Sequence, residues 1–232
     1  MTKPWVAAKR IRYINRSPDI NPPASTPAAV LQVKGLCFDY PGQPLFSDFS
    51  TLVPPGVTLL RGGAGRGKTT LLRLLAGVLP PGAGQMHING VSLQAQPQAY
   101  RQQVFWAEPR SDAFDQLKAL AYFAAVRDRH VGFDDALLAL VIAGLSLAEH
   151  VGKPLFMLSS GSKRKVWLAA AFASRAAVTL LDEPFAALDK KSIGFVLELL
   201  QDAADHPERA WVLAHHEAPG EVRLAAVIDL GD

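Results

Sequence analysis

A glycine-rich segment has the residue types and the spacing that bind phosphate. It fits the pattern G-x-x-x-x-G-K-[ST], in which small residues let backbone N–H groups curl around the phosphates of a nucleotide. Lys68 can reach the β- and γ-phosphates, and the hydroxyl of Thr69 can ligate Mg²⁺. The predicted nucleotide-binding residues are Gly62, Gly63, Ala64, Gly65, Arg66, Gly67, Lys68, Thr69 and Thr70.

An acidic pair far downstream supports this prediction. Asp182 and Glu183 directly follow an apolar run. Asp182 would complete the Mg²⁺ environment, directly or through water. Glu183 would orient or deprotonate the water that attacks the γ-phosphate, a general-base role worth roughly 10²- to 10⁴-fold in rate. The acidic pair alone is a weak signal, but together with the phosphate-binding segment it indicates nucleotide hydrolysis.

Short apolar runs must position these residues. They alternate with helical stretches, which predicts an α/β domain with a mostly parallel sheet. In such sheets ligands bind beyond the carboxyl ends of the strands, where the first three runs are followed by the glycine-rich loop, the acidic pair, and His215 with His216. Residues 113–158 are predicted to form a helical lobe inserted into this core. The four runs lie at residues 57–60, 178–181, 211–214 and 225–230.

The positive charge of the chain lies outside this predicted core. The 232 residues are 49% hydrophobic and carry a net charge of +3. Residues 1–30 contain five Lys and Arg against one Asp, so they carry +4 and residues 31–232 carry −1. We therefore expect a flexible, basic and proline-rich extension at residues 1–29 and one domain at residues 30–232. Because the domain is nearly neutral, we expect no nucleic-acid partner.

The sequence has no features of a membrane-spanning or secreted chain. It has no run of 18 or more apolar residues, and its basic N-terminus is not followed by the hydrophobic region of a secretory signal. A single cysteine excludes an intramolecular disulfide. We expect a soluble chain in a reducing, cytosolic compartment.

Further motifs narrow the nucleotide hydrolases to one family. Residues 158–162 resemble the LSGGQ signature of the ATP-binding cassette (ABC) family, and residues 186–189 resemble its D-loop, which ends in Asp189. His216 resembles the family's switch histidine, and Tyr40 resembles the aromatic residue of its A-loop. These motifs occur in family order over residues 31–232. The signature residues are Leu158, Ser159, Ser160, Gly161 and Ser162.

The resemblance implies a fold and a set of roles. The fold would be that of a P-loop NTPase, a RecA-like core with a mostly parallel sheet, an inserted α-helical subdomain at about residues 106–165 and small N-terminal β elements. Tyr40 would stack on adenine, and His216 would neutralise the γ-phosphate together with Lys68, Mg²⁺ and the N–H groups of the signature helix, while Glu183 acts on the attacking water. Ser159 and Gly161 would complete the site of a second copy, so that two ATP molecules lie between two subunits.

The sequence departs from the family pattern at several positions. Glu108 stands nearest to the place of the Q-loop glutamine, and it adds a negative charge near Mg²⁺. Ser160 replaces the first glycine of the signature, at a cost on the order of 1 kcal/mol if the backbone there needs φ > 0. Ser162 replaces the signature glutamine. The charged run 163–165 is expected to be the solvated first turn of the signature helix rather than a nucleic-acid patch.

The two adjacent histidines could suggest a metal site. Because neighbouring residues on a strand point to opposite faces, we expect that His215 and His216 do not ligate one ion. His216 is assigned to the γ-phosphate by matching His-His-Glu to the family's Thr-His-Asp pattern.

The resemblance implies an ATPase that energises a transporter. Its partners would be a second cassette subunit and separately encoded membrane-spanning permease subunits, docked near residues 104–125 at the cytoplasmic face of the membrane. The alternative is a non-transport ABC ATPase in complex assembly, translation or repair. Transport is favoured because the sequence has neither long coiled-coil insertions nor a second cassette. The outline also resembles haem exporters of cytochrome c assembly and drug or lipid exporters, while cargo and direction stay open.

Overall fold

The computed structural model describes residues 29–108 and 112–231. The flexible extension predicted at residues 1–29 therefore lies, apart from Ala29, outside the described residues. Within them, two sheets and six α-helices form a mixed α/β fold, as the sequence predicts. None of the described helices is long and apolar enough to cross a membrane.

A five-stranded parallel sheet forms the centre of the fold. Its strand order is β6-β7-β8-β3-β9, and every neighbouring pair is parallel. The four apolar runs found in the sequence are four of these strands, and β6 adds an edge. The strands are β3 (Gly56–Arg61), β6 (Val104–Trp106), β7 (Val178–Asp182), β8 (Ala210–Ala214) and β9 (Leu224–Asp229).

The apolar runs form strands because both faces of this sheet are buried. Leu180 and Val212 pack into the core that contains helix α1 (Lys68–Leu75), whereas Leu181 and Leu213 pack into the core on the opposite face. Since side chains alternate along a strand, Asp182 at the end of β7 points to the same face as Leu180. The period of the strand thus directs this carboxylate toward α1.

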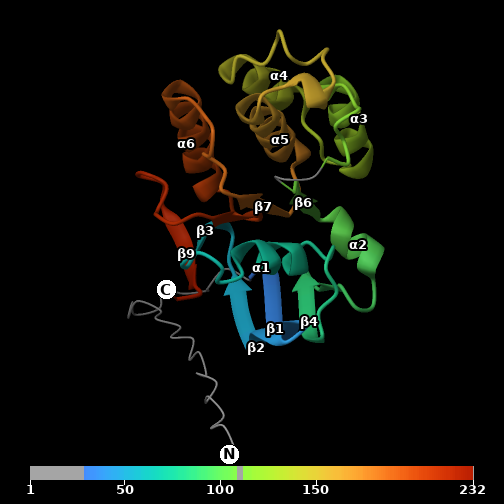
Figure 1. Cartoon of the computed structure of the whole chain (residues 1–232), viewed down its shortest axis with the longest axis vertical. Helices are drawn as coiled ribbons and strands as arrows, with labels where there is room; N and C mark the ends of the chain where they lie inside the picture. Colours follow the sequence, from blue (N-terminus) through green and yellow to red (C-terminus); the bar gives the residue numbers. More distant parts are fainter. Residues whose placement is uncertain (1–28, 109–111, 232) are drawn as a thin grey trace, which may run out of the picture.

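A second, antiparallel sheet covers α1 on its other side, so that the helix lies between the two sheets (Figure 1). Its strand order is β2-β1-β4-β5, and β1 ends at Tyr40 beside the glycine-rich loop. Helix α2 (Pro97–Gln102) leads from this sheet to β6. The strands are β1 (Leu31–Tyr40), β2 (Gln43–Val53), β4 (Ala83–Ile88) and β5 (Val91–Ser92).

Helices fill the chain between β6 and β7, where the sequence predicts an inserted helical lobe. They lie on the side of the central sheet opposite α1, next to α6 (Lys190–Ala204) (Figure 1). Asp134 caps α4 by accepting a hydrogen bond from the backbone N–H of Leu137. The inserted elements are α3 (Ala119–Arg129), α4 (Asp135–Gly144), a 3₁₀ turn (Leu155–Met157) and α5 (Ser160–Ser174).

One aromatic contact joins α5 to the central sheet. Trp211 on β8 is 2% exposed, and its ring centroid lies 4.7 Å from that of Phe172 on α5. The guanidinium of Arg209 lies 5.6 Å from the centroid of the same indole ring. This contact holds α5 on the strand that leads to the two histidines.

We expect Trp211→Ala to lower the free energy of unfolding by about 3–5 kcal/mol, because it leaves a cavity beneath α5. Urea denaturation measures the change. The control is Val131→Ala at a fully exposed position, which should change stability by less than about 0.5 kcal/mol. Equal effects of the two substitutions would contradict the anchoring role of Trp211.

Candidate active site

The glycine-rich loop connects β3 to α1 at the carboxyl edge of the parallel sheet. Gly67 precedes the helix with φ 91°, a conformation that favours glycine. A Cβ at Gly62 would lie 3.1 Å from the carbonyl oxygen of Gly231, which itself accepts a hydrogen bond from the N–H of Gly63 at 2.9 Å. Lys68 Nζ donates to the carbonyls of Gly62 and Gly63 at 2.6 and 3.0 Å. The ammonium group of Lys68 is thus held at the glycine-rich loop, where a phosphate would bind.

A hydrogen bond joins α1 to β7. Thr69 Oγ1 donates to Asp182 Oδ2 at 2.6 Å. A hydroxyl and a carboxylate offer the hard oxygen donors that Mg²⁺ prefers, and they lie beside the phosphate-binding loop. These two residues therefore fit a magnesium site of the predicted composition.

Glu183 is fixed in an unusual backbone conformation directly after β7. Its φ is 47°, which is uncommon for a residue other than glycine, and its N–H donates to Ala214 O at 2.9 Å. Its carboxylate Oε2 is hydrogen-bonded to His215 Nδ1 at 2.8 Å. The turn therefore directs the carboxylate toward the end of the neighbouring strand β8.

Arg164 on α5 holds the backbone of this turn, a contact that no sequence pattern predicts. Its guanidinium donates to the backbone carbonyls of Asp182 and Glu183 at 3.0 and 2.6 Å. Burial lowers the pKa of Arg164, and the carboxylates of Asp182 and Glu183 oppose this shift. A single guanidinium nitrogen, Nη1, donates to both consecutive carbonyls, which fixes the peptide groups around Glu183.

Two pockets meet at the loop. The first, of about 610 Å³, includes Gly62, Gly63 and His216 in its lining. The second, of about 600 Å³, includes Thr69 and Asp182. Both pockets are lined by a shared set, which is Ala64, Lys68 and Glu183. The structure thus brings together the predicted phosphate, metal and general-base residues.

The expectation that the two histidines point apart is wrong. Strand β8 ends at Ala214, so His215 and His216 lie beyond the regular alternation of the strand. Their ring centroids are 4.2 Å apart in an edge-to-face arrangement. His216 lines the first pocket, while His215 is packed against the ring of Phe185 at 5.3 Å.

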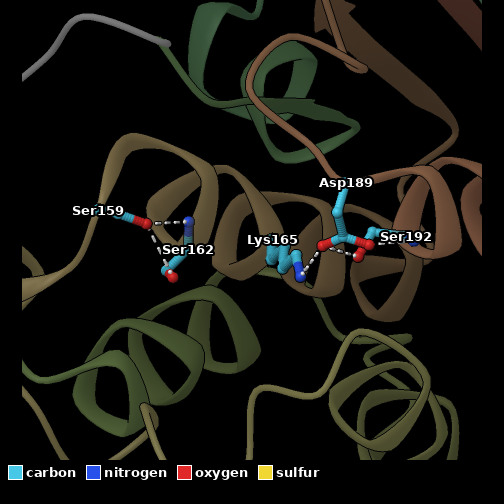
Figure 2. Close-up of polar contacts among 5 residues, drawn as sticks. All are labelled: Ser159, Ser162, Lys165, Asp189 and Ser192. Carbon is cyan, nitrogen blue, oxygen red and sulfur yellow. Dashed lines mark hydrogen bonds and ion pairs between the residues drawn. The ribbon is translucent and has the colours of Figure 1, made fainter.

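The signature residues cap their own helix (Figure 2). Ser159 is the N-cap of α5, and its Oγ accepts from the N–H of Ser162 at 3.1 Å and donates to Ser162 Oγ at 3.0 Å. Leu158 is buried, whereas Ser159 and Ser160 are exposed. None of residues 158–162 is among the described residues that line the two pockets.

Gly161 is needed for packing, and Ser160 is tolerated. A Cβ at Gly161 would lie 2.4 Å from the carbonyl oxygen of Ala187 in the D-loop, so a side chain there would collide with backbone. Ser160 is the first residue of α5 and has no positive φ, so the strain considered for a serine there does not arise. The signature helix and the D-loop of one chain are therefore in direct contact.

Asp189 in the D-loop is a helix cap in this structure (Figure 2). Its carboxylate accepts from the N–H and the Oγ of Ser192 at 2.8 and 2.9 Å and pairs with Lys165 Nζ at 2.8 Å. The hydrogen bond from Lys165, followed by those from Ser192, holds the pKa of Asp189 well below its usual range. Asp189 is therefore ionised throughout the neutral range and joins α5 to α6.

The expectation of a solvated charged run at residues 163–165 is wrong. Lys163 pairs with Asp115 at 2.7 Å, Lys165 pairs with Asp189, and Arg164 bonds to the turn after β7. The side chains of Lys163 and Lys165 are only 19% and 16% exposed. Successive helical residues point in different directions, so each cation contacts a different neighbouring segment.

The two remaining predicted residues flank the loop. The hydroxyl of Tyr40 is hydrogen-bonded to Thr70 Oγ1 at 3.2 Å, and the residue is 39% exposed. Glu108 lines the second pocket and forms an ion pair with Arg73 on α1. The negative charge that the sequence adds at this position is thus accompanied by a positive one.

Comparisons with known proteins identify the family of this chain. The sequence model of the family described as ABC transporter matches residues 47–186. The chain is 34% identical to a taurine import ATP-binding protein from Pseudomonas fluorescens, over 85% of this chain and 75% of the relative. It is 32% identical to a cytochrome c biogenesis ATP-binding export protein from Pseudomonas syringae, over 80% of this chain and 88% of the relative.

Solved structures show the same fold. An ATP-binding subunit of an ABC transporter superposes with a TM-score of 0.72 at 24% identity, covering 80% of this chain and 79% of the other. The cbiO1 protein from Clostridium perfringens, described as part of an ABC transporter complex, gives a TM-score of 0.61 at 20% identity, with coverages of 82% and 79%. The chain thus belongs to the ABC transporter family, as one of its ATP-binding, ATP-hydrolysing subunits.

Proposed function

We propose that two copies of this chain bind two ATP molecules between them, with Mg²⁺, and that closure on ATP and opening after hydrolysis drive a membrane permease. The observation that carries this proposal is the hydrogen bond between Thr69 and Asp182, with Lys68 and Glu183 in the walls of both adjoining pockets. Residues 30–232 would form the ATPase domain, with a helical subdomain at about residues 106–165.

Phosphate binding would use groups that are already oriented. Lys68 would exchange its hydrogen bonds to two loop carbonyls for bonds to phosphate oxygens. The backbone N–H groups at the start of α1 would donate to the same phosphates. Mg²⁺ supplies charge neutralisation at the phosphates when bound, and Thr69 with Asp182 would hold it. The exposed ring of Tyr40 is available to stack on adenine.

Glu183 would act as the general base on the attacking water. Three contacts position it: Ala214 O accepts from its N–H, Arg164 donates to its carbonyl, and His215 bonds to its carboxylate. His216 in the first pocket would contact the γ-phosphate. Because these groups come from different elements, the turn after β7 is the point where strand, signature helix and histidine pair meet.

The position of the signature supports the proposed dimer. Ser159 and Gly161 begin α5 away from the pockets lined by their own chain, so we assign them to the nucleotide of a second copy. The N-terminus of α5 would then direct its backbone N–H groups toward the γ-phosphate of that nucleotide. Neither copy has a complete site alone.

An exposed apolar surface marks the proposed permease contact. Two segments form it, since the N–H of Phe156 donates to Asp115 O at 2.9 Å and thereby joins residues 114–120 to residues 155–157. The membership of relatives in import and export systems supports transport without selecting a cargo. We propose that this chain would bind its permease as a peripheral subunit at the cytoplasmic face of the membrane. The exposed apolar residues are Phe114, Leu117, Leu120, Phe156 and Met157.

Glu183→Gln tests the proposed function directly. We expect ATP binding to persist, hydrolysis to fall at least about a hundredfold, and an ATP-bound dimer to accumulate, because the amide cannot accept the proton of water. Phosphate release and size-exclusion chromatography with ATP measure these outcomes. Glu198→Gln on the exposed side of α6 is the matched control and should leave both unchanged. A Glu183→Gln protein that hydrolyses ATP at the wild-type rate would contradict the proposal.

Arg164 is expected to act as a positioning residue. Arg164→Met keeps most of the side-chain volume and removes the donors, so kcat should fall about 10- to 100-fold through misplacement of Glu183 while KM for ATP changes less than about threefold. Arg164→Lys should recover part of kcat. Steady-state kinetics of both variants separate this role from substrate binding, since a rise in KM with unchanged kcat would exclude it.

Glu108→Gln should leave hydrolysis largely intact. The ion pair with Arg73 is partly exposed, so its loss changes rates by only about two- to fivefold. ATPase rates at a series of MgCl₂ concentrations test this expectation. Complete loss of activity would show instead that the Glu108 carboxylate takes part in the chemistry.

A further inference from the structure

Three side chains with metal-binding atoms converge in the active site. One carboxylate oxygen of Glu183 and one ring nitrogen each of His215 and His216 all lie within 4.8 Å of one another. The closest pair is Glu183 Oε2 and His215 Nδ1 at 2.8 Å. A regular strand through His215 and His216 would point the two side chains to opposite faces, so the sequence alone does not predict this cluster.

The donor set differs from that of the proposed magnesium site. Thr69 and Asp182 offer only oxygen, which suits Mg²⁺. Two imidazoles and one carboxylate suit Zn²⁺ and similar divalent transition ions, which prefer nitrogen donors and accept three protein ligands with water in the fourth position. Asp182 therefore belongs to a site that suits Mg²⁺, whereas the next residue, Glu183, belongs to a cluster that suits Zn²⁺.

The cluster is held in place before any ion arrives. His215 is only 16% exposed and packs against Phe185, and Arg164 fixes the backbone of Glu183. His216 is exposed and lines the pocket of about 610 Å³, which leaves a path for an ion and room for a bound water. Tetrahedral coordination at about 2.0–2.2 Å would replace the hydrogen bond between Glu183 and His215 and would bring the three ligand atoms, now within 4.8 Å of one another, around one ion.

We propose that Glu183, His215 and His216 form a binding site for a divalent transition ion such as Zn²⁺, and that occupation of this site inhibits ATP hydrolysis. The ion would take the carboxylate lone pair of Glu183 that must accept the proton of water. It would also occupy the His216 imidazole that faces the phosphate pocket. The binding site stands on geometry alone, whereas the inhibition rests on the proposed function of Glu183.

Three cations oppose an ion at this cluster: Arg164 donates to the backbone carbonyl of Glu183, and Arg61 and Lys68 line the same pocket. Lys68 Nζ is bonded to two loop carbonyls and so is turned toward the glycine-rich loop. When ATP is bound, the lysine and the γ-phosphate occupy this pocket. Zn²⁺ binding should therefore be strongest in the nucleotide-free protein and should weaken as ATP fills the site.

Direct binding tests the site without any catalysis. The nucleotide-free full chain, with any histidine tag removed, is titrated with Co²⁺ and the visible absorption of the bound ion is recorded, followed by displacement with Zn²⁺. His215→Asn and His216→Asn should each weaken binding by at least the roughly 10- to 100-fold that loss of a supporting ligand partner costs. His150→Asn, at a histidine outside the cluster, is the control and should leave the affinity unchanged.

Two results would overturn the site. One is Co²⁺ binding that neither His215→Asn nor His216→Asn weakens. The other is an absorption band of thiolate coordination, which would place the ion at Cys37. Loss of binding in both variants, with the control unaffected, supports it.

Inhibition is tested separately with free Zn²⁺ held by a metal buffer in the presence of excess Mg²⁺ and ATP. Each variant is normalised to its own zinc-free rate, because His215 also positions Glu183. The free Zn²⁺ concentration that halves the ATPase rate should rise at least about tenfold in His216→Asn. Binding with no loss of activity would overturn the inhibitory role. Full activity of Glu183→Gln would instead overturn the proposed function and leave the Co²⁺ result standing.

Discussion

The hydrogen bond from Thr69 to Asp182 is the contact on which the active site depends. It joins the helix that follows the glycine-rich loop to strand β7 of the parallel sheet, on the face that packs against α1. Because side chains alternate along β7, the pattern that buries Leu180 against α1 also aims Asp182 at Thr69. The phosphate-binding loop and the acidic turn are thereby brought to one edge by strand geometry.

The active site also depends on the conformation of the turn after Asp182. Glu183 adopts a φ of 47°, a conformation that costs free energy for most residues and that neighbouring contacts must maintain. Arg164 supplies those contacts from the signature helix, and the end of β8 supplies the rest. An unfavourable backbone at the catalytic carboxylate is thus stabilised by two elements far apart in sequence.

The strands and the phosphate-binding residues could be predicted from the sequence because their signals are local. A run such as residues 178–181 is apolar because both of its faces are buried, and Gly67 is glycine because of its own φ. Arg164 could not be predicted, since its partners are backbone carbonyls and carry no sequence pattern. The histidine pair was misjudged because its orientation depends on whether β8 ends at Ala214 or one residue later.

The burial of the charged side chains near the signature could not be predicted either, because it depends on tertiary contacts. Lys163 and Lys165 would be solvated on an isolated helix, but Asp115 and Asp189 reach them from segments that fold against α5. Similarly, the role of Gly161 follows from the position of Ala187 rather than from its own dihedral angles. The domain boundaries and the roles of individual site residues stay predictions.

The direct packing of Gly161 on the D-loop has a mechanical consequence for the proposed dimer. Helix α5 would touch the nucleotide of the second copy at its N-terminus, through Ser159 and Gly161, while its first turns are bonded to the acidic turn and the D-loop of its own chain. In the proposed dimer the helix would therefore act as a short rigid rod between the two nucleotide sites, so that neither site could rearrange without displacing the other.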